Sequence, residues 1–466
     1  MNRYILLASL AALFAFSFYA FGKTSDCPTI IENAHIEHLD STMQHVRDYV
    51  PKFAVMAHRG STYWTPEETE AAYRWAREVG ADYLECDLQC SKDGVILALH
   101  DDNLTRTTNI KQIYGDSLPE TRKEYYIRYR GMTETEALAQ CEIDRRDFVP
   151  YRAGSYMYCE LMKLDAGSWF NAAYPSRACK GFSAIHQYVS TLEDLVNFAR
   201  GNRLKRNAEG EREYEIVPAG DDGRVVYKFS YVKDTIAGDP SFGRNRPGIY
   251  IEFKEPDLNP VTFEQDVYAK LDELGFNIIT RPEPTDAPYY IDGVVNVGNT
   301  NGKTVLQTFS KESLRRSAEV FRGMIPMCFL LWNGDGKNDI HDVTPDNYAA
   351  FINYGVRNKA HIMGPSIAGE PNLYPELDAP WMSALVRKSG MLNHPYSFDT
   401  LYQMQKYYGE DNETDNMQFE GPFLDGAFTN RSDITIQYFI DKGVRPYPAP
   451  QTVPNPEKLL ETLGYK

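Results

Sequence analysis

Several features of other protein classes are missing from this sequence of 466 residues. No two cysteines stand in a CxxC spacing, which leaves a zinc-thiolate site with little support. No repeat occurs at the period of solenoid proteins. No long polar low-complexity tract of the kind that stays disordered is present either. We therefore expect a globular protein whose core is large enough for one big domain or two smaller ones.

Positive charge is also scarce. The chain has 49 lysines and arginines against 65 aspartates and glutamates, for a formal net charge of −16. This surplus of acid argues against nucleic acid or an anionic membrane surface as a general partner. It does not exclude a small anionic ligand, but such a ligand would need a local cationic site.

The N-terminus carries a long apolar run. Arg3 precedes an uncharged stretch over Ile5–Phe21, and Ala20-Phe21-Gly22 offers small residues at the two positions that a signal peptidase reads. We predict a signal peptide over residues 1–22, an N-terminal extension over 23–52, and export to the periplasm or the medium. A retained membrane anchor is the alternative, although the run is near the short limit for a span. After cleavage we expect no stable membrane insertion.

Seven cysteines are present, and export would permit disulfide bonds among them. Their pairing does not follow from the sequence, and the odd number leaves at least one thiol unpaired within the chain.

Short apolar runs alternate with helical stretches along the chain. Eight units that each join a strand to a helix predict an α/β fold, a TIM (β/α)8 barrel over residues 53–466. A doubly wound open sheet is the alternative. The eight strand-like runs are Phe53–Ala57, Asp82–Gln89, Ile249–Phe253, Thr304–Phe309, Met327–Trp332, His361–Gly364, Met391–Tyr396 and Phe423–Thr429.

The first predicted helix covers Glu68–Gly80, where apolar residues recur on one face. The sequence before it, Thr65-Pro66-Glu67-Glu68, predicts a capping box with proline at the first helical position.

Two long stretches interrupt the alternation, at about residues 109–162 and 203–246. The first is too long for a bare loop between a strand and a helix, so we expect it to have its own secondary structure. In the second, alternating residues on both sides of Asp221-Asp222-Gly223 predict a β-hairpin. We expect both insertions at the C-terminal face of the strands, where they would roof any site there.

Carboxylates on two of the predicted strands suggest a cation site. Glu85 and Asp87 alternate with Cys86 and so point to the same face of their strand. Burying two unpaired carboxylates is costly, so they need a cation, unless the strand ends in solvent. Glu252 stands near the end of the next long strand-like run. Three carboxylates form an all-oxygen ligand set that suits one hard divalent cation, Ca²⁺ or Mg²⁺.

Four further residues near strand ends suggest chemistry on a phosphate. Arg59 and Lys254 could supply positive charge, and arginine can bind two phosphate oxygens at once. His58 and His100 offer two imidazoles for proton transfer near neutral pH. Each residue alone has an ordinary structural explanation. In a barrel, however, all of them fall at the C-terminal strand ends, where active sites form.

With these residues in place, the chain resembles the glycerophosphodiester phosphodiesterases, and most closely their periplasmic bacterial branch. The similarity runs in order from about Phe53 to Phe439, outside the two insertions. The motifs that carry it are HRG at 58–60, PEET at 66–69, GADYLECDLQCSKDG at 80–94, LHDDNLTRTT at 99–108, LDAGSWF at 164–170, STLEDLV at 190–196, IYIEFKEP at 249–256, VLQTFSKESL at 305–314, NHPYSF at 393–398 and DGAFTNRSD at 425–433.

The resemblance implies a TIM barrel that binds one divalent cation and hydrolyses a glycerophosphodiester, a small molecule, to an alcohol and sn-glycerol 3-phosphate. It assigns the residues as follows: metal binding to Glu85, Asp87 and Glu252, acid–base catalysis to His58 and His100, and phosphate binding to Arg59 and Lys254. Glu67 matches an acidic position of the family and is expected to support the site.

Trp169 and Tyr396 are further candidates for substrate binding, and His394 could touch the glycerol or close the barrel. The family's usual Asn and Thr are Glu68 and Ser91 in this chain. The headgroup and the division of roles between the two histidines stay open, as does the choice between water and the neighbouring glycerol hydroxyl as nucleophile.

Two other functions remain compatible with the sequence. A phospholipase similar to sphingomyelinase D pairs the same kinds of residues, but would need an apolar rim that faces lipid. A non-catalytic protein that binds phosphodiesters would be marked by the loss of a histidine or a metal ligand, and none is missing.

Overall fold

The computed structural model describes residues 31–220, 223–240, 242–410, 419, 421–445 and 453–466. The predicted signal peptide lies outside these residues, as does Cys27. Among the described residues, no helix is long and apolar enough to cross a membrane. The six cysteines in this part of the chain are all free thiols.

Eight parallel strands form the centre of the fold, in the order β14-β13-β12-β11-β8-β2-β1-β15. Backbone hydrogen bonds bring the two ends of this sheet together: Asp425 N donates to Asn393 O at 2.8 Å, and Phe428 N to Pro395 O at 3.1 Å. The predicted TIM barrel is therefore confirmed, and the open sheet is wrong. The strands are β1 (Ala54–Ala57), β2 (Tyr83–Cys90), β8 (Gly248–Phe253), β11 (Thr304–Thr308), β12 (Met327–Leu330), β13 (Ile362–Gly364), β14 (Leu392–Asn393) and β15 (Gly426–Thr429).

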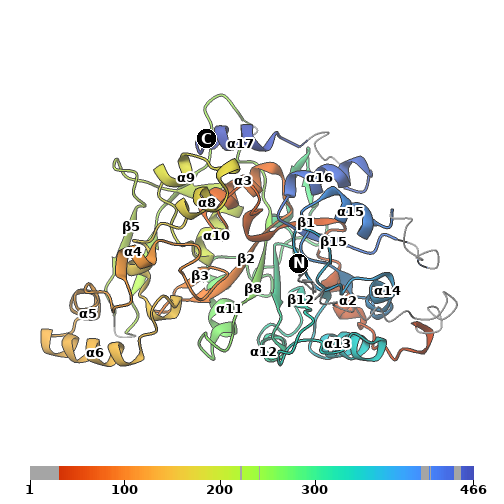
Figure 1. Ribbon diagram of the computed structural model, residues 1–466, viewed down its shortest axis with the longest axis horizontal. Coiled ribbons are helices and arrows are strands. Elements are labelled where there is room, and N and C mark those ends of the chain that lie inside the picture. The colour runs from red at the N-terminus through yellow and green to blue at the C-terminus, as the bar shows by residue number, and fades with distance from the viewer. Residues whose placement is uncertain (1–30, 221–222, 241, 411–418, 420, 446–452) are drawn as a thin grey trace, which may run out of the picture.

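One longer helix follows each barrel strand and packs outside the sheet (Figure 1). These helices are α3 (Glu70–Val79), α10 (Leu192–Ala199), α11 (Phe263–Glu273), α12 (Lys311–Phe321), α13 (Pro345–Arg357), α14 (Pro380–Ser389), α15 (Leu401–Tyr408) and α16 (Ser432–Asp441).

Side chains along the barrel strands alternate between the core beneath the helices and the barrel interior. On β2, Leu84, Cys86 and Leu88 face outward into the core beneath the helices. Tyr83 faces the barrel interior, where its ring meets that of Tyr250 at 5.6 Å. Because side chains alternate, the next inward positions after Tyr83 are Glu85 and Asp87. The interior thus changes from aromatic to charged toward the C-terminal strand ends.

The two insertions pack against each other beside the barrel, where Figure 1 shows α4, α5, α6 and β5 together on one side. Antiparallel pairing of β5 with β6 confirms the predicted hairpin, although its turn residues 221–222 lie outside the described residues. The elements of this region are α4 (Ile110–Tyr114), α5 (Arg122–Arg130), α6 (Glu134–Asp147), α7 (Tyr158–Leu161), β4 (Asn202–Leu204), β5 (Tyr214–Val217), β6 (Val226–Phe229) and β7 (Tyr231–Lys233).

Shorter elements complete the described part of the chain. They are α2 (Ser41–Arg47), β3 (Ile96–Ala98), α8 (Ser168–Ala173), α9 (Gly181–Ala184), β9 (Tyr290–Ile291), β10 (Val294–Val295) and α17 (Pro456–Thr462), with 3-10 turns η1 (His58–Gly60), η2 (Ala153–Ser155), η3 (Pro175–Arg177) and η4 (Val297–Asn299).

The start of α3 differs from the prediction. The helix begins at Glu70, and its cap is Thr69, whose hydroxyl accepts from Ala72 N at 3.3 Å. Thr65 instead contacts the carbonyls of the turn before it. The reason is Glu68, which has a positive φ of 58° and whose N–H donates to Arg59 O at 3.0 Å. These contacts tie the predicted capping box to η1 rather than to the helix.

Gly60 ends η1 at a point that admits no side chain. Its φ is +82°, and a Cβ there would lie 2.5 Å from the Cβ of Ala72. Close packing of this turn on α3 therefore requires glycine. The contact fixes the His-Arg-Gly turn between the end of β1 and the first turn of α3.

We predict that Gly60→Ala lowers the free energy of unfolding by about 2–4 kcal/mol, because left-handed backbone strain and a steric clash act together. Denaturant unfolding would measure the loss. Gly94→Ala is the matched control, since Gly94 has a φ of +85° but no described atom lies within 4 Å of the place that a Cβ would take. It should lose only about 1–2 kcal/mol. Equal losses in the two variants would contradict the packing argument.

Candidate active site

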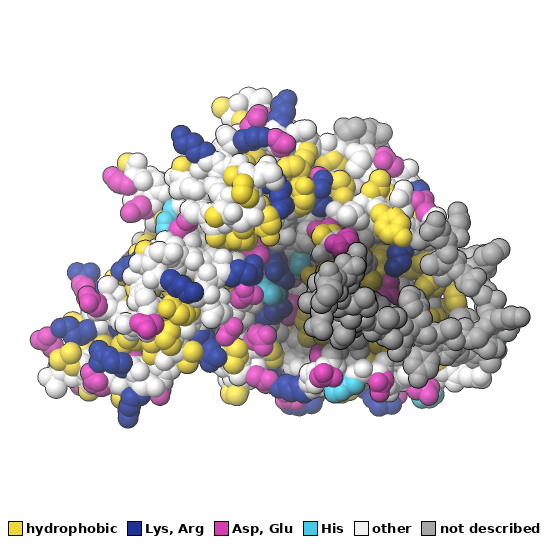
Figure 2. All heavy atoms as spheres, viewed as in Figure 1, with side chains coloured by type: hydrophobic (Ala, Val, Ile, Leu, Met, Phe, Trp, Pro, Cys, Tyr) yellow, Lys and Arg dark blue, Asp and Glu magenta, His cyan; other side chains and the backbone are white. Residues whose placement is uncertain are grey.

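A cavity of about 250 Å³ lies at the C-terminal ends of the barrel strands. In Figure 2, histidine, basic and acidic side chains gather in a hollow near the middle of the face shown. Seven of the predicted residues line the cavity together: His58, Arg59, Glu85, Asp87, His100, Glu252 and Lys254. Its other wall is largely aromatic, with Phe309, Trp332, Tyr374, Tyr396 and Phe428. The described lining includes no residue of either insertion, so the expected roof over the site is not formed by them.

Glu85 is held by two donors from different elements. Its Oε2 accepts from the backbone N–H of Arg59 at 2.7 Å, and its Oε1 accepts from Gln307 Nε2 at 2.7 Å. Burial and the neighbouring Asp87 raise the pKa of Glu85 to about 8. The carboxyl group is therefore oriented firmly although its charge is unfavourable where it lies.

Asp87 and Glu252 face each other across paired strands, because β2 and β8 run parallel with these residues in register. Both carboxyl groups are buried side by side, so their negative charges repel each other. Burial and Asp87 raise the pKa of Glu252 well above its usual range, against the opposing effect of Lys254. Burial also acts to raise the pKa of Asp87, but Lys254, His100 and Arg59 outweigh it and hold that pKa well below its usual range. The pKa values of the two neighbouring carboxyl groups are therefore shifted in opposite directions.

The chemistry of this group fits a hard divalent cation. All three carboxyl groups are buried, and Asp87 Oδ2 has no hydrogen-bond partner. A cation would offset the repulsion among these carboxylates, and oxygen ligands are those that Ca²⁺ and Mg²⁺ prefer. Among the described residues, however, no three His, Cys, Asp or Glu side chains stand at the spacing of a ready-made metal cage.

Two cationic side chains border the same carboxyl groups. Arg59 Nε lies 3.3 Å from Asp87 Oδ2, and Lys254 Nζ lies 3.5 Å from Glu252 Oε1 and 3.7 Å from Asp87 Oδ1. Burial works against the charge of Lys254, but Glu252 and Asp87 outweigh it and raise its pKa. The cavity floor therefore joins anionic and cationic groups, as a phosphodiester with a bound cation would require.

His58 is oriented by an amide. Its Nδ1 lies 2.7 Å from Asn430 Oδ1, while Asn430 Nδ2 donates to both carboxyl oxygens of Asp399 at 3.1 Å. The amide oxygen therefore faces His58, so Nδ1 carries the proton and Nε2 is the basic nitrogen. Burial and the nearby Arg59 lower the pKa of His58 to about 3.

His100 has a charged partner instead. Its Nδ1 donates to Asp101 Oδ1 at 2.5 Å. Burial and Arg59 lower its pKa, while Asp87 and Asp101 act in the opposite direction. His100 and Lys254 also line a second hollow of about 250 Å³ that includes Asp101 and Arg106. The two histidines thus differ in the partner that supports each ring and in the space that each faces.

Of the remaining predicted residues, one lines the cavity and the others lie outside its lining. Tyr396 lines the cavity, with its hydroxyl bonded to Leu331 O at 2.6 Å. Glu67 lies behind Arg59, with Oε1 3.7 Å from Arg59 Nη1. Trp169 is placed outside the described cavity lining, with its ring 5.9 Å from Arg106 Cζ. His394 is fully buried against Tyr250 and belongs to the barrel interior.

Sequence reasoning gave no role to several residues that orient the site. Asn430 and Asp101 hold the two imidazoles, and Gln307 holds Glu85. Each stood within a motif quoted for the resemblance. Asn430 directly follows strand β15 and Asp101 directly follows His100, so position at a strand end or beside a histidine was the available signal.

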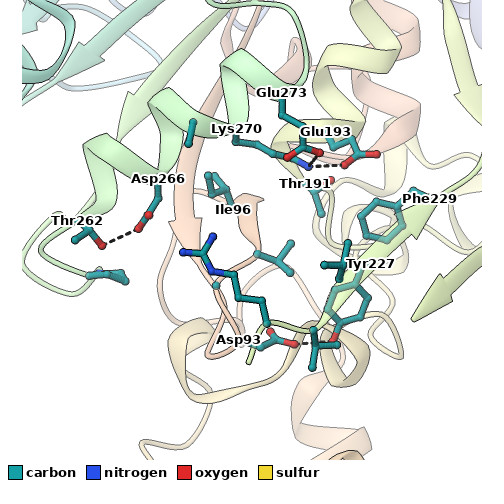
Figure 3. A pocket seen from close by; sticks show the side chains of 17 residues that line it. Asp93, Ile96, Thr191, Glu193, Tyr227, Phe229, Thr262, Asp266, Lys270 and Glu273 are labelled. Atoms are coloured by element: carbon teal, nitrogen blue, oxygen red, sulfur yellow. Dashed lines mark hydrogen bonds and ion pairs between the residues drawn. The ribbon is translucent and has the colours of Figure 1, made fainter. Parts of the chain in front are cut away.

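A larger hollow of about 520 Å³ lies elsewhere, between α11, the β2–β3 turn and the β5–β6 hairpin. Figure 3 shows that Lys270 lies between Glu193 and Glu273, and that Asp93 accepts from the Tyr227 hydroxyl. It contains no histidine. The arrangement at the strand ends is therefore the better candidate for a reactive site.

Comparison with known proteins agrees with this choice. A protein-family model described as "Glycerophosphoryl diester phosphodiesterase family" matches residues 58–284 of this chain. The matched stretch is a little under half of the 466 residues of this chain. The matched region contains both candidate histidines, Arg59, Lys254 and all three clustered carboxylates.

Relatives match a limited part of the chain. A glycerophosphodiester phosphodiesterase of Bacillus subtilis is 31% identical over 146 residues, which are 31% of this chain and 36% of that protein. The glycerophosphoinositol inositolphosphodiesterase GDPD2 of Mus musculus is 28% identical over 165 residues, 34% of this chain and 25% of that protein. The chain thus spans about a third or less of these curated relatives.

A solved structure of an Oleispira antarctica phosphodiesterase, in complex with the product sn-glycerol-3-phosphate, is 15% identical with a TM-score of 0.45. The aligned region covers 84% of this chain and 97% of the chain in that structure. Similar proteins also occur in mammals and plants, so the comparisons do not single out a periplasmic branch.

We predict that His58 stays neutral, protonated at Nδ1, between pH 5 and pH 8. Its pKa is lowered to about 3 in the fold, whereas an unfolded chain would bind the proton below about pH 6.5 and so lower stability as the pH falls. Nitrogen NMR of histidine-labelled protein would report both the charge and the tautomer. Asn430→Ala should yield a mixture of tautomers. Titration of His58 near pH 6.5 in the unaltered protein would contradict this geometry.

Proposed function

We propose that this protein is a metal-dependent glycerophosphodiester phosphodiesterase, which hydrolyses its small-molecule substrate to an alcohol and sn-glycerol 3-phosphate. One observation carries the proposal. Two histidines, two positively charged side chains and three carboxylates line a single cavity of about 250 Å³ at the strand ends. Such a cavity can bind a phosphodiester, neutralise its charge and move protons on both sides of it.

Glu85, Asp87 and Glu252 would hold the cation, either Ca²⁺ or Mg²⁺. When bound, a divalent cation polarises a phosphoryl oxygen and neutralises charge that grows on it. Arg59 and Lys254 contribute to the same neutralisation from the protein side. Glu68 supports this arrangement, because its Oε1 accepts from Asp87 N at 3.0 Å and so fixes the backbone beneath the proposed ligand.

The different partners of the two histidines suggest their roles. Asp101 opposes the lowering of the His100 pKa by burial and Arg59, so we assign to His100 the transfer of a proton to the departing alkoxide. The second hollow beside His100 offers space for the alcohol. The contact of His58 Nδ1 with Asn430 leaves Nε2 without a proton, so we assign to this nitrogen the proton of the attacking hydroxyl, which belongs to water or to the glycerol. Burial and Arg59 lower the pKa of His58 to about 3 and make it a weak base in the free protein.

The aromatic wall of the cavity supports binding of the glycerol part. Tyr396 and Phe309 meet edge to face at 5.7 Å, and Trp332 and Tyr374 at 5.5 Å. These rings offer apolar surface opposite the charged floor. We also propose that the protein is exported to the periplasm or the medium, which the apolar run at Ile5–Phe21 supports.

The direct test is an assay of purified protein against a panel of glycerophosphodiesters, with glycerol phosphate release as the readout. Chelation should abolish activity and lower the melting temperature, and Ca²⁺ or Mg²⁺ should restore both, because the clustered carboxylates repel one another without a cation. Glu252→Gln replaces a proposed carboxylate ligand with a neutral amide, so the metal should no longer raise the melting temperature. Full activity after exhaustive chelation would refute the requirement for a cation. If no diester released glycerol phosphate, the proposed phosphodiesterase activity would be refuted.

The roles of the histidines can be separated by leaving group. His58→Ala and His100→Ala should each lower kcat by about 10²–10⁴-fold on a glycerophosphodiester. A nitrophenyl ester needs little protonation of its leaving oxygen, so it should restore activity to His100→Ala and leave His58→Ala impaired. Restoration of His58→Ala alone would reverse the assignment. Unimpaired activity in both variants would disprove the two-histidine mechanism.

A further inference from the structure

Arg106 joins two parts of the site that the chain supplies from separate segments. Its Nε donates to Asp101 Oδ2 at 2.5 Å. Its Nη1 and Nη2 donate to Glu67 Oε2 and Oε1 at 2.9 and 2.5 Å. One guanidinium therefore holds the carboxylate behind His100 and the carboxylate behind Arg59.

Each of these two carboxylates also contacts a group that lines the cavity. Asp101 uses Oδ1 for His100 Nδ1, so the bond from Arg106 to Oδ2 fixes the remaining rotation of that carboxylate. Glu67 Oε1 lies 3.7 Å from Arg59 Nη1. A continuous series of ionic contacts thus runs from His100 through Asp101, Arg106 and Glu67 to Arg59.

We propose that Arg106 is a positioning residue that sets His100 and Arg59 relative to each other, so that the proton donor and the phosphate-binding group act on the same substrate. The proposal rests on the phosphodiesterase function proposed above. Arg106 is not in the described lining of the cavity that holds the reactive groups; it lines the adjoining hollow. It therefore acts through its two carboxylate partners rather than on the phosphate.

The planar fork explains why this position needs arginine. Two parallel bonds to Glu67 and a third bond to Asp101 use three nitrogens in fixed directions, which an ammonium group cannot reproduce. Trp169 supports the same group, because its ring lies 5.9 Å from Arg106 Cζ. Trp169, expected from the sequence to bind substrate, would on this basis help to orient Arg106.

The test compares Arg106→Ala and Arg106→Lys with a matched control, Arg315→Ala. Arg315 also joins two carboxylates, those of Glu312 and Glu319, and its side chain is 45% exposed against 43% for Arg106. It lies on α12, away from the site lining. Arg315→Ala therefore measures the loss of an equally exposed arginine, although its partner carboxylates are more exposed than Glu67 and Asp101.

Both Arg106 variants should lower kcat by about 10–100-fold, because residues that support reactive groups have effects of that size. KM should change less than kcat, because the groups that bind the phosphate are unaltered and only the hollow proposed for the alcohol loses a lining residue. Arg315→Ala should retain the original kcat. Added guanidinium, but not ammonium at the same concentration, should restore part of the activity of Arg106→Ala. In the Asp101→Asn background, Arg106→Ala should cost much less, because the path to His100 is already broken.

Three results would contradict the proposed role of Arg106. A rise in KM with kcat unchanged would mean that Arg106 contacts the headgroup directly. Full activity in Arg106→Lys would mean that only its charge matters. Unchanged kcat in both variants would end the proposal. If Arg106→Ala fails to fold, Arg106→Lys and the Asp101→Asn background still decide the question.

A second readout does not depend on activity. The Nδ1 proton of His100, observed by NMR of histidine-labelled protein, should shift in Arg106→Lys and not in Arg315→Ala. Should the unaltered protein hydrolyse no glycerophosphodiester, the proposed function would fall, while this resonance would still show whether Arg106 holds Asp101 and His100 in place. An unshifted resonance would refute the positioning role by itself.

Discussion

The contact between Asp87 and Glu252 governs the site. Parallel pairing of β2 with β8 places the two carboxyl groups opposite each other inside the barrel, where like charges cannot both be borne without compensation. Arg59 and Lys254 border the two carboxyl groups and offset part of this repulsion. The proposed cation would offset the rest, so metal binding would follow from this buried repulsion.

The His-Arg-Gly turn brings the other essential groups to that contact. Gly60 allows the turn to pack directly on α3, and the backbone N–H of Arg59 reaches Glu85. The adjacent residues His58 and Arg59 therefore serve different ends: one imidazole nitrogen is fixed by Asn430, while the guanidinium lies against Asp87. The proposed mechanism combines proton transfer and phosphate binding in this one short turn, whose backbone as well as its side chains contacts the carboxylates.

The environments of the two histidines differ in a way that suits opposite steps of one reaction. An amide supports His58, whereas a carboxylate supports His100, and a carboxylate favours the protonated ring more than an amide does. The contacts of Arg106 extend this asymmetry across the mouth of the site to Glu67 and Arg59. Side chains from separate strand–helix units are thus joined by ionic contacts outside the lining of the cavity.

The sequence by itself determined the barrel and which side chains share a face. Apolar runs that alternate with helices specify the strand–helix units, and the period of two along a strand puts Glu85 and Asp87 on one side. Only the tertiary structure decided the start of α3, where Glu68 binds back to η1, and the placement of the insertions beside the cavity. It also decided the partners of the histidines, because Asn430 lies 372 residues from His58. Such contacts depend on how distant segments pack, and no local pattern encodes that packing.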